Sequence, residues 1–185
     1  MTVIPIGIRC EGAAHLKSNG ERKNAFPFDW IFCSLDVVQH CIETNFSYFL
    51  DVSLYKTFVH PEHGIRTHHL LYDDMNLSDT IILYHHIHAD KGDTFCTFVH
   101  QNMLDVPTYD AFSRRAQRFM TTLDEASESS PVTLLYVMEH ISPEEIEIYK
   151  TKLLDFRTFL KNRWSFVYLK VYWFTPPNSL SDFSF

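Results

Sequence analysis

An α/β fold with a mainly parallel sheet is predicted by the regular patterns of the last third of the sequence. Residues 132–138 and 165–173 form two unbroken apolar runs, and residues 143–160 between them carry apolar side chains at three- and four-residue steps. A strand–helix–strand crossover of this length indicates parallel pairing in a sheet covered on both faces. We therefore expect a single three-layer α/β domain over residues 1–185, of the Rossmann-like or hydrolase-like kind.

The beginning of the sequence repeats the strand-then-helix order. Residues 3–6 form a short apolar run that ends at Gly7, and a helix pattern follows over residues 11–17. Cys10 is therefore expected on the turn between the two elements or in the first helical turn.

Between these two regions the signals are weaker. The remaining expectations are a helix over 35–44 capped by Ser34, a loop-rich stretch over 46–79, buried strands over 80–86 and 94–100, a helix over 109–123, and a docked or frayed tail over 178–185.

Composition and charge narrow the function classes. The 185 residues carry a net charge of −7, from 23 acidic and 16 basic side chains, which argues against nucleic acid or a membrane surface as a general partner. Four cysteines without CxxC spacing, no long apolar run and no signal-peptide pattern favour reduced thiols in a cytoplasmic protein. The five glycines include no Gly-rich phosphate loop, so we expect no nucleotide cofactor.

Cys10 is the best candidate for a reactive group. At a helix N-terminus, unpaired N–H groups and the helix dipole stabilise a thiolate. Arg9 adds positive charge to this effect, and Glu11 opposes it. The alternative is that Cys10 is a small buried apolar residue, which is the reading we give to Cys33, Cys41 and Cys96 because they sit in apolar patterns.

Histidines are concentrated in the middle of the chain, where eight of the eleven lie between residues 60 and 100. His85 and His86 end one expected strand and His100 ends another, so they are expected at the same carboxyl edge of the sheet as Cys10. A histidine there can serve as the base that activates a thiol. The alternatives are a metal site, although no HExxH spacing is present, or partly buried histidines with local hydrogen bonds.

Asp29 lies in the apolar stretch 27–31 and needs a partner if it is buried. It is expected to orient a histidine, to pair with an arginine such as Arg22, or to cap the following helix. The run of Arg114, Arg115 and Arg118 either binds an anionic substrate or forms a solvated helix face with one buried ion pair. The residues expected to contact substrate are Arg9, Trp30, Asn102 and Arg115.

The N-terminal motifs also carry a family resemblance. Gly7-Ile8-Arg9-Cys10, followed by a helix and by Pro27-Phe28-Asp29-Trp30, resembles the opening of a domain family labelled "putative papain-like cysteine peptidase", whose pattern is Ser-Leu-Gly-x-x-Cys and then Pro-Phe-Asp-Trp. The similarity continues through residues 46–51 and through His100 with the later Arg-Arg-x-x-Arg-Phe run. Pro5-Ile6 replaces Ser-Leu, and the residues after His100 depart from a more usual pair of histidines.

The resemblance implies Cys10 as the nucleophile and His100 as the base, with His85 or His86 next. The alternating strands and helices still favour a parallel sheet over a true papain barrel. Three functions stay open: a cysteine-dependent hydrolase or acyl-transfer enzyme acting on a peptide or a small acyl- or sugar-containing substrate, a metal-dependent hydrolase using the histidines, and a non-catalytic binding module.

Overall fold

The computed structural model of the chain describes residues 1–8, 10–60, 64–79, 96–98, 100–139, 143–175 and 179–182. The expected strand 80–86, which includes His85 and His86, lies outside these residues, and so does Arg9.

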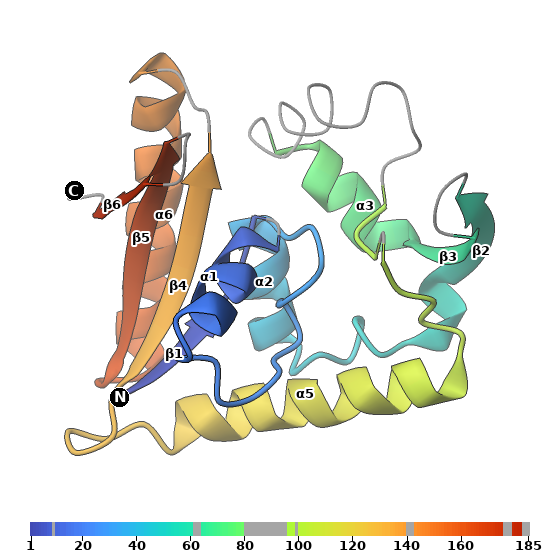
Figure 1. The fold of residues 1–185 in the computed structure, drawn as a ribbon, viewed down its shortest axis with the longest axis horizontal. Helices are drawn as coiled ribbons and strands as arrows, with labels where there is room; N and C mark the ends of the chain where they lie inside the picture. Colours follow the sequence, from blue (N-terminus) through green and yellow to red (C-terminus); the bar gives the residue numbers. More distant parts are fainter. Residues whose placement is uncertain are drawn as a thin grey trace.

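The main sheet has four strands in the order β1-β4-β5-β6 (Figure 1). Strands β1, β4 and β5 are parallel, and β6 is antiparallel to β5. The mainly parallel α/β fold is therefore confirmed, and the described part of the C-terminal tail is an edge strand. The strands are β1 (Thr2–Pro5), β4 (Val132–Glu139), β5 (Val167–Thr175) and β6 (Ser179–Asp182).

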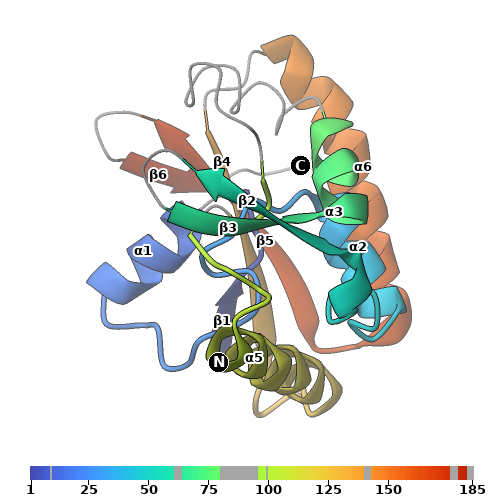
Figure 2. The same ribbon diagram turned by 90° about the vertical axis from the view of Figure 1, so that its right-hand side faces the viewer.

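Helices cover both faces of this sheet, which gives the three expected layers (Figures 1 and 2). On one face, Leu16 of α1 (Glu11–Ser18) packs against Leu135 and Val137 of β4. On the other face lie α6 (Pro143–Arg163) and α2 (Leu35–Glu43), whose first turn is capped by Ser34 through a bond from Val37 N–H. The buried side of α6 is the predicted apolar face, made of Tyr149, Leu153, Phe156 and Leu160.

The stretch 46–79 is more regular than expected. It contains the short 3-10 helix η1 (Val52–Leu54), the antiparallel hairpin of β2 (Tyr55–His60) and β3 (Gly64–His69), and then α3 (Leu70–Leu77). The expectation of a loop-rich stretch was wrong because polar side chains fill the buried positions here. Thr67 and His69 of β3 are both fully buried.

The expected strand 94–100 is also corrected where the structure describes it. Thr97, Phe98 and His100 lie in turns, and the Phe98 carbonyl accepts a hydrogen bond from Gln101 N–H at 2.9 Å. The described apolar residues of this segment, Cys96 and Phe98, are buried as predicted. Two side chains of α3 hold Thr97: Asp73 accepts from the Thr97 N–H, and Asn76 donates to Thr97 Oγ1.

Helix α5 (Val106–Asp124) begins earlier than the predicted residue 109, because Asp105 accepts a hydrogen bond from Thr108 N–H and caps it. It runs along one side of the molecule from the hairpin to the main sheet (Figure 1). None of the helices in the described part of the chain is long and apolar enough to cross a membrane.

Candidate active site at the carboxyl edge of the sheet

The chain leaves β1 along a tightly packed path. Beyond the strand, Val137 N–H donates to the Gly7 carbonyl and Ile8 N–H donates to the Val137 carbonyl, both at 3.4 Å, so the segment keeps following β4. Gly7 has φ +150°, and a Cβ there would lie 2.4 Å from the Cys33 carbonyl oxygen and 2.8 Å from Cε2 of Tyr136. Only glycine fits this position, and its fit sets the direction in which the chain turns toward Cys10.

Cys10 is the N-cap residue of α1, as the sequence predicted for the turn. Its side chain is partly exposed, makes no capping hydrogen bond, and has its Sγ 4.0 Å from Oε1 of Glu11. The first amide groups of a helix have no helical carbonyl to bind, so the thiol stands next to positive dipole ends.

The topology places Cys10 at a reversal point of the sheet. Strands β1 and β4 are neighbours, yet the helix after β1 packs on one face and the helix after β4 packs on the other. In open α/β sheets, ligands bind in the crevice outside the carboxyl ends of such a pair of strands. Cys10 comes five residues after the last residue of β1 and therefore lies on the side of the sheet where the carboxyl ends of β1 and β4 meet.

The segment that carries His100 reaches the same region through two hydrogen bonds. Cys33 N–H donates to the Ile8 carbonyl at 3.1 Å, and Phe32 N–H donates to the Thr97 carbonyl at 3.0 Å. Hydrogen-bonded segments lie about 5 Å apart, so two such steps place the backbones of Ile8 and Thr97 roughly 10 Å apart. His100 follows Thr97 by three residues and is exposed.

Two buried side chains of α3 hold these segments in place, and sequence reasoning missed both. Asn76 accepts a hydrogen bond from Ser34 N–H and donates to the Phe32 carbonyl and to Thr97 Oγ1, at 2.9, 3.1 and 2.9 Å. Asp73 accepts from Thr97 N–H at 2.8 Å. A buried amide and carboxylate one turn apart on a helix would have been the signal, but the helix itself was not predicted.

Asp73 also pairs with a histidine. Nδ1 of His68 donates to Oδ2 of Asp73 at 2.7 Å, and the His68 ring stacks on Phe58. The same carboxylate therefore contacts both His68 and the Thr97 segment. Among the described histidines between residues 60 and 100, His68 has a carboxylate partner on its ring nitrogen.

Asp29 is fully buried and pairs with an arginine, which is one of the three roles expected for it. Nε of Arg22 donates to Oδ2 of Asp29 at 3.0 Å, Nη2 of Arg22 contacts the same oxygen, and Phe26 N–H donates to it at 3.1 Å. Burial raises the pKa of Asp29, although Arg22 opposes this rise. The described contacts join Asp29 to Arg22 and to no histidine.

Of the four residues expected to contact substrate, the structure describes Trp30, Asn102 and Arg115. Trp30 lies beside Arg22, with the guanidinium carbon 5.8 Å from the ring centre. Asn102 has its side-chain oxygen occupied by Leu104 N–H at 3.1 Å, in the turn that leads into α5. Arg115 lies on α5, within electrostatic range of Asp29.

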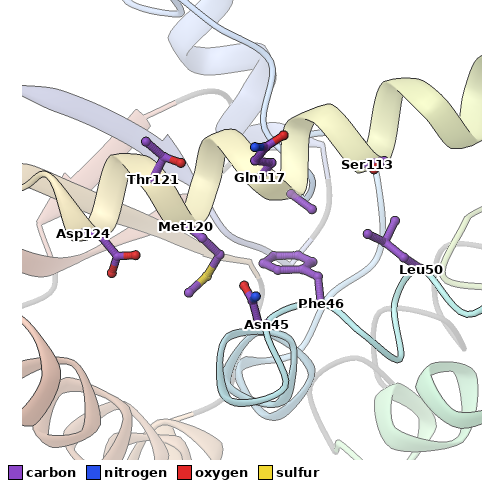
Figure 3. Close-up of a pocket in the computed structure, with 9 residues that line it drawn as sticks. Asn45, Phe46, Leu50, Ser113, Gln117, Met120, Thr121 and Asp124 are labelled. Atoms are coloured by element: carbon purple, nitrogen blue, oxygen red, sulfur yellow. The ribbon is translucent and has the colours of Figure 1, made fainter.

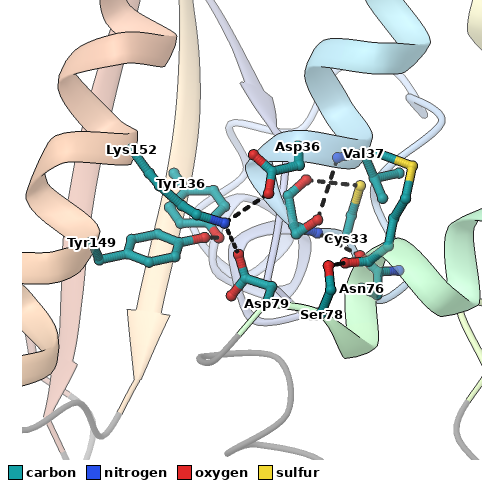
Figure 4. A network of polar contacts seen from close by, with 11 residues as sticks. Cys33, Asp36, Val37, Asn76, Ser78, Asp79, Tyr136, Tyr149 and Lys152 are labelled. Carbon is teal, nitrogen blue, oxygen red and sulfur yellow. Dashed lines mark hydrogen bonds and ion pairs between the residues drawn. The ribbon is translucent and has the colours of Figure 1, made fainter.

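A polar network around Lys152 joins α6, α2 and the residue that follows the C-cap of α3 (Figure 4). Nζ of Lys152 on α6 contacts Oδ2 of Asp36 on α2 at 2.7 Å and Oδ2 of Asp79, just after α3, at 3.0 Å. The hydroxyls of Tyr136 and Tyr149 bond to each other beside it. Burial raises the pKa of both tyrosines, and the negative charge of Asp79 raises both pKa values further. Since the Tyr136 ring touches Gly7, the network supports the path of the chain toward Cys10.

The cavity drawn in Figure 3, of about 440 Å³, lies away from these residues, between α5 and the turn after α2. Its lining contains none of the residues predicted as catalytic or substrate-binding. Asn45 and Phe46 at its floor both have positive φ, at 48° and 60°. The lining residues are Asn45, Phe46, Leu50, Ser113, Ala116, Gln117, Met120, Thr121 and Asp124.

The other three cysteines are buried, in agreement with their apolar patterns. Burial raises the pKa of Cys33, and it raises the pKa of Cys41 to about 12. In the part of the chain that the structure describes, no group of three or more His, Cys, Asp or Glu side chains is placed to hold a metal ion.

Fold and site together define an α/β chain with a cysteine at the carboxyl edge of a mainly parallel sheet. Residues 1–165 match the model of the family described as "Putative papain-like cysteine peptidase (DUF1796)", and the chain belongs to this family. This membership supports a cysteine-dependent hydrolase at a coarse level. The chain matched none of the curated proteins and none of the solved structures with which it was compared.

Proposed function

We propose that the chain is a cysteine-dependent hydrolase or acyl-transfer enzyme, with Cys10 as the nucleophile and His100 as the base. The observation that carries the proposal is the place of Cys10, at the N-terminus of α1 and at the reversal point between β1 and β4. Membership in a family described as cysteine peptidases supports the same chemistry.

The reaction would follow the usual course for a thiol nucleophile. The Cys10 thiol transfers its proton to the base, and its Sγ attacks the carbonyl carbon of a peptide or of a small acyl- or sugar-containing substrate. Amide groups of the first turn of α1 stabilise the negative oxygen that develops. The base then protonates the leaving amine or alcohol, and water or another acceptor releases the acyl group from Sγ.

The candidates for the base are His100, His85 and His86. Two hydrogen bonds support His100: Phe32 N–H donates to the carbonyl of Thr97 in its segment, and the neighbouring Cys33 N–H donates to the Ile8 carbonyl. His85 and His86 stay candidates from the sequence, and they lie outside the described residues. His68 is the natural comparison, because Asp73 already holds its ring nitrogen.

The testing experiment is the pH dependence of iodoacetamide alkylation at each cysteine, followed by mass spectrometry. We expect Cys10 to react with an apparent pKa well below the ordinary value of about 8.5. Cys33, Cys41 and Cys96 serve as controls in the same sample, since they are buried and should react only after unfolding. A Cys10 thiol that also waits for unfolding would overturn the proposal.

Variants then connect this reactivity to turnover on a panel of peptide and ester substrates. Cys10→Ser should abolish activity and leave the melting temperature unchanged, because the side chain makes no capping bond. His100→Asn should remove the low apparent pKa of Cys10, whereas His68→Asn should not. If His68→Asn alone removes it, the base is assigned wrongly. A Cys10→Ser variant that stays active excludes the whole mechanism.

A further inference from the structure

Helix α5 carries an arginine cluster on the flank that faces the loop after α1. With about 100° between successive residues, Arg114, Arg115 and Arg118 fall on one side of the helix. Nη1 of Arg118 donates to the Ala25 carbonyl at 2.7 Å. This hydrogen bond holds the flank of α5 next to the loop that contains Arg22. Four guanidinium groups therefore gather in a protein whose net charge is −7.

Asp29 is the described carboxylate whose charge acts on Arg115. Asp29 has Arg22 and Phe26 N–H on Oδ2, while its buried Oδ1 has no hydrogen-bond partner among the described residues. The charges of Arg114, Arg115 and Arg118 are then in excess.

Arg115 is half-buried and, unlike Arg22 and Arg118, forms no hydrogen bond with the described residues. Its guanidinium lies 4.8 Å above the Phe112 ring and makes no hydrogen bond or ion pair with the described residues. Burial lowers the pKa of Arg115, and the neighbouring arginines lower it further, while Asp29 opposes both effects. A half-buried guanidinium has lost part of its hydration, so leaving its five donors unused costs free energy.

We propose that Arg115, with Arg118 and Arg22 beside it, forms a binding site for an oxyanion of the phosphate type. An arginine fork matches a phosphate with two parallel hydrogen bonds, and stacking on Phe112 fixes the plane of the fork. The excess of positive charge favours a doubly charged phosphate over a singly charged carboxylate. The pairing of Arg22 with Asp29 keeps that carboxylate from repelling the ligand.

This site is separate from Cys10. Arg22 follows the C-terminal end of α1 and Cys10 begins the helix, and an eight-residue helix is about 12 Å long. The inference therefore does not rest on the proposed hydrolase, and its test needs no turnover.

The experiment measures the melting temperature of the full chain as inorganic phosphate replaces chloride at constant ionic strength. We expect a rise that saturates with phosphate, and a smaller rise with acetate. Arg115→Gln should weaken phosphate binding about tenfold or more, because a charge-assisted fork is lost. Arg157→Gln on α6 is the charge-matched control and should respond to phosphate like the unchanged protein.

The melting temperature without phosphate gives a second, independent reading. Because Arg115 makes no hydrogen bond or ion pair with the described residues and its burial is unfavourable, Arg115→Gln should leave this temperature unchanged or raise it. A clear fall would show that Arg115 neutralises Asp29 and would overturn the proposal. A phosphate response that Arg115→Gln leaves intact, or no response in the unchanged protein, would also overturn it. An equal response to acetate would refute the preference for phosphate.

Discussion

The main sheet and the hairpin unit are stabilised in different ways. In the main sheet, β4 and α6 meet through apolar side chains such as Leu134 and Leu153, both fully buried. In the hairpin unit of β2, β3 and α3, the side chains that join the elements are polar, with His69, Asp73 and Asn76 at the centre. Directional hydrogen bonds also occur in the main sheet, between the Tyr136 and Tyr149 hydroxyls, but in the hairpin unit they join most of the elements.

This difference predicts a different tolerance to substitution. Apolar contacts depend on volume and shape, so a swap that conserves volume costs little. A buried hydrogen-bonding group that is replaced leaves its partners unsatisfied, at about 1–3 kcal/mol for each. The segment that carries His100 is attached through the hairpin unit. The position of the proposed base therefore depends on the unit that tolerates substitution less well.

The largest expected difference between the two units comes from two substitutions that each nearly conserve side-chain volume. Asn76→Asp keeps the shape, but it cannot donate to the Phe32 carbonyl and it places a carboxyl group in a fully buried position, so it should lower the free energy of unfolding by about 3–4 kcal/mol. Leu153→Met lies in the main sheet with its covering helices, here called the apolar half. It should lower the free energy of unfolding by less than about 1.5 kcal/mol. Urea unfolding of both variants measures the difference, and equal costs would remove the distinction between the two halves.

Gly7 is a place in the main sheet where a substitution should be poorly tolerated too. In Gly7→Ala, the new Cβ would meet the Cys33 carbonyl oxygen at 2.4 Å, at a φ that side chains rarely adopt, so we expect a loss of about 2–3 kcal/mol. Alkylation of Cys10 should slow as well, since the turn is displaced. Gly12→Ala is the control, because its nearest contact would be a Cβ at 3.1 Å and the helix gains stability from alanine. If Gly7→Ala leaves the free energy of unfolding unchanged, the turn can shift to accommodate a side chain.

Lys152 connects the two halves, and its replacement tests how strongly they are joined. Lys152→Met removes the cation that faces the buried Asp79 and the more exposed Asp36, so about 1–2 kcal/mol should be lost. Lys150→Met on the same helix breaks an exposed pair with Glu147 and should cost below about 0.5 kcal/mol. Thermal unfolding separates the two variants, and similar values would mean that the Lys152 contacts are screened like surface pairs.

The apolar half could be predicted from the sequence because its buried positions are occupied by apolar side chains at regular spacing. The runs over 132–138 and 165–173 gave the parallel strands, and the apolar steps in 143–160 gave the buried face of α6. Cys10 was placed at the turn after β1 for the same reason.

The hairpin unit could not be predicted because its buried residues look like surface residues in the sequence. His69 caps α3 in place of Ser, Thr, Asp or Asn, so no helix start was visible there. The bonds of Asn76 span 42 and 44 positions along the chain, and such pairings cannot be inferred from spacing. Asp29 was recognised as needing a partner, and Arg22 was among those expected, but only the fold selected it.

The smallest predicted effect uses pH to distinguish the two halves. Nδ1 of His69 accepts a hydrogen bond from Tyr72 N–H and caps α3, while Nε2 donates to the Tyr48 carbonyl, so the ring is held neutral. Burial lowers the pKa of His69, although the Tyr48 carbonyl, Asp73 and Asp51 oppose this. A lowered folded pKa means that the unfolded chain binds the proton more tightly, so stability is fully present above about pH 6.5 and falls as the pH drops through the folded pKa.

Protonation would remove the helix cap, which is worth about 1 kcal/mol. We therefore expect the melting temperature to fall between pH 7 and pH 5 by more in the unchanged protein than in His69→Asn, because asparagine caps a helix without titrating. His15→Asn, on α1 beside the apolar half, should keep the full pH dependence. If His69→Asn and the unchanged protein lose stability in parallel, the pH sensitivity belongs to other groups and the hairpin unit is not its origin.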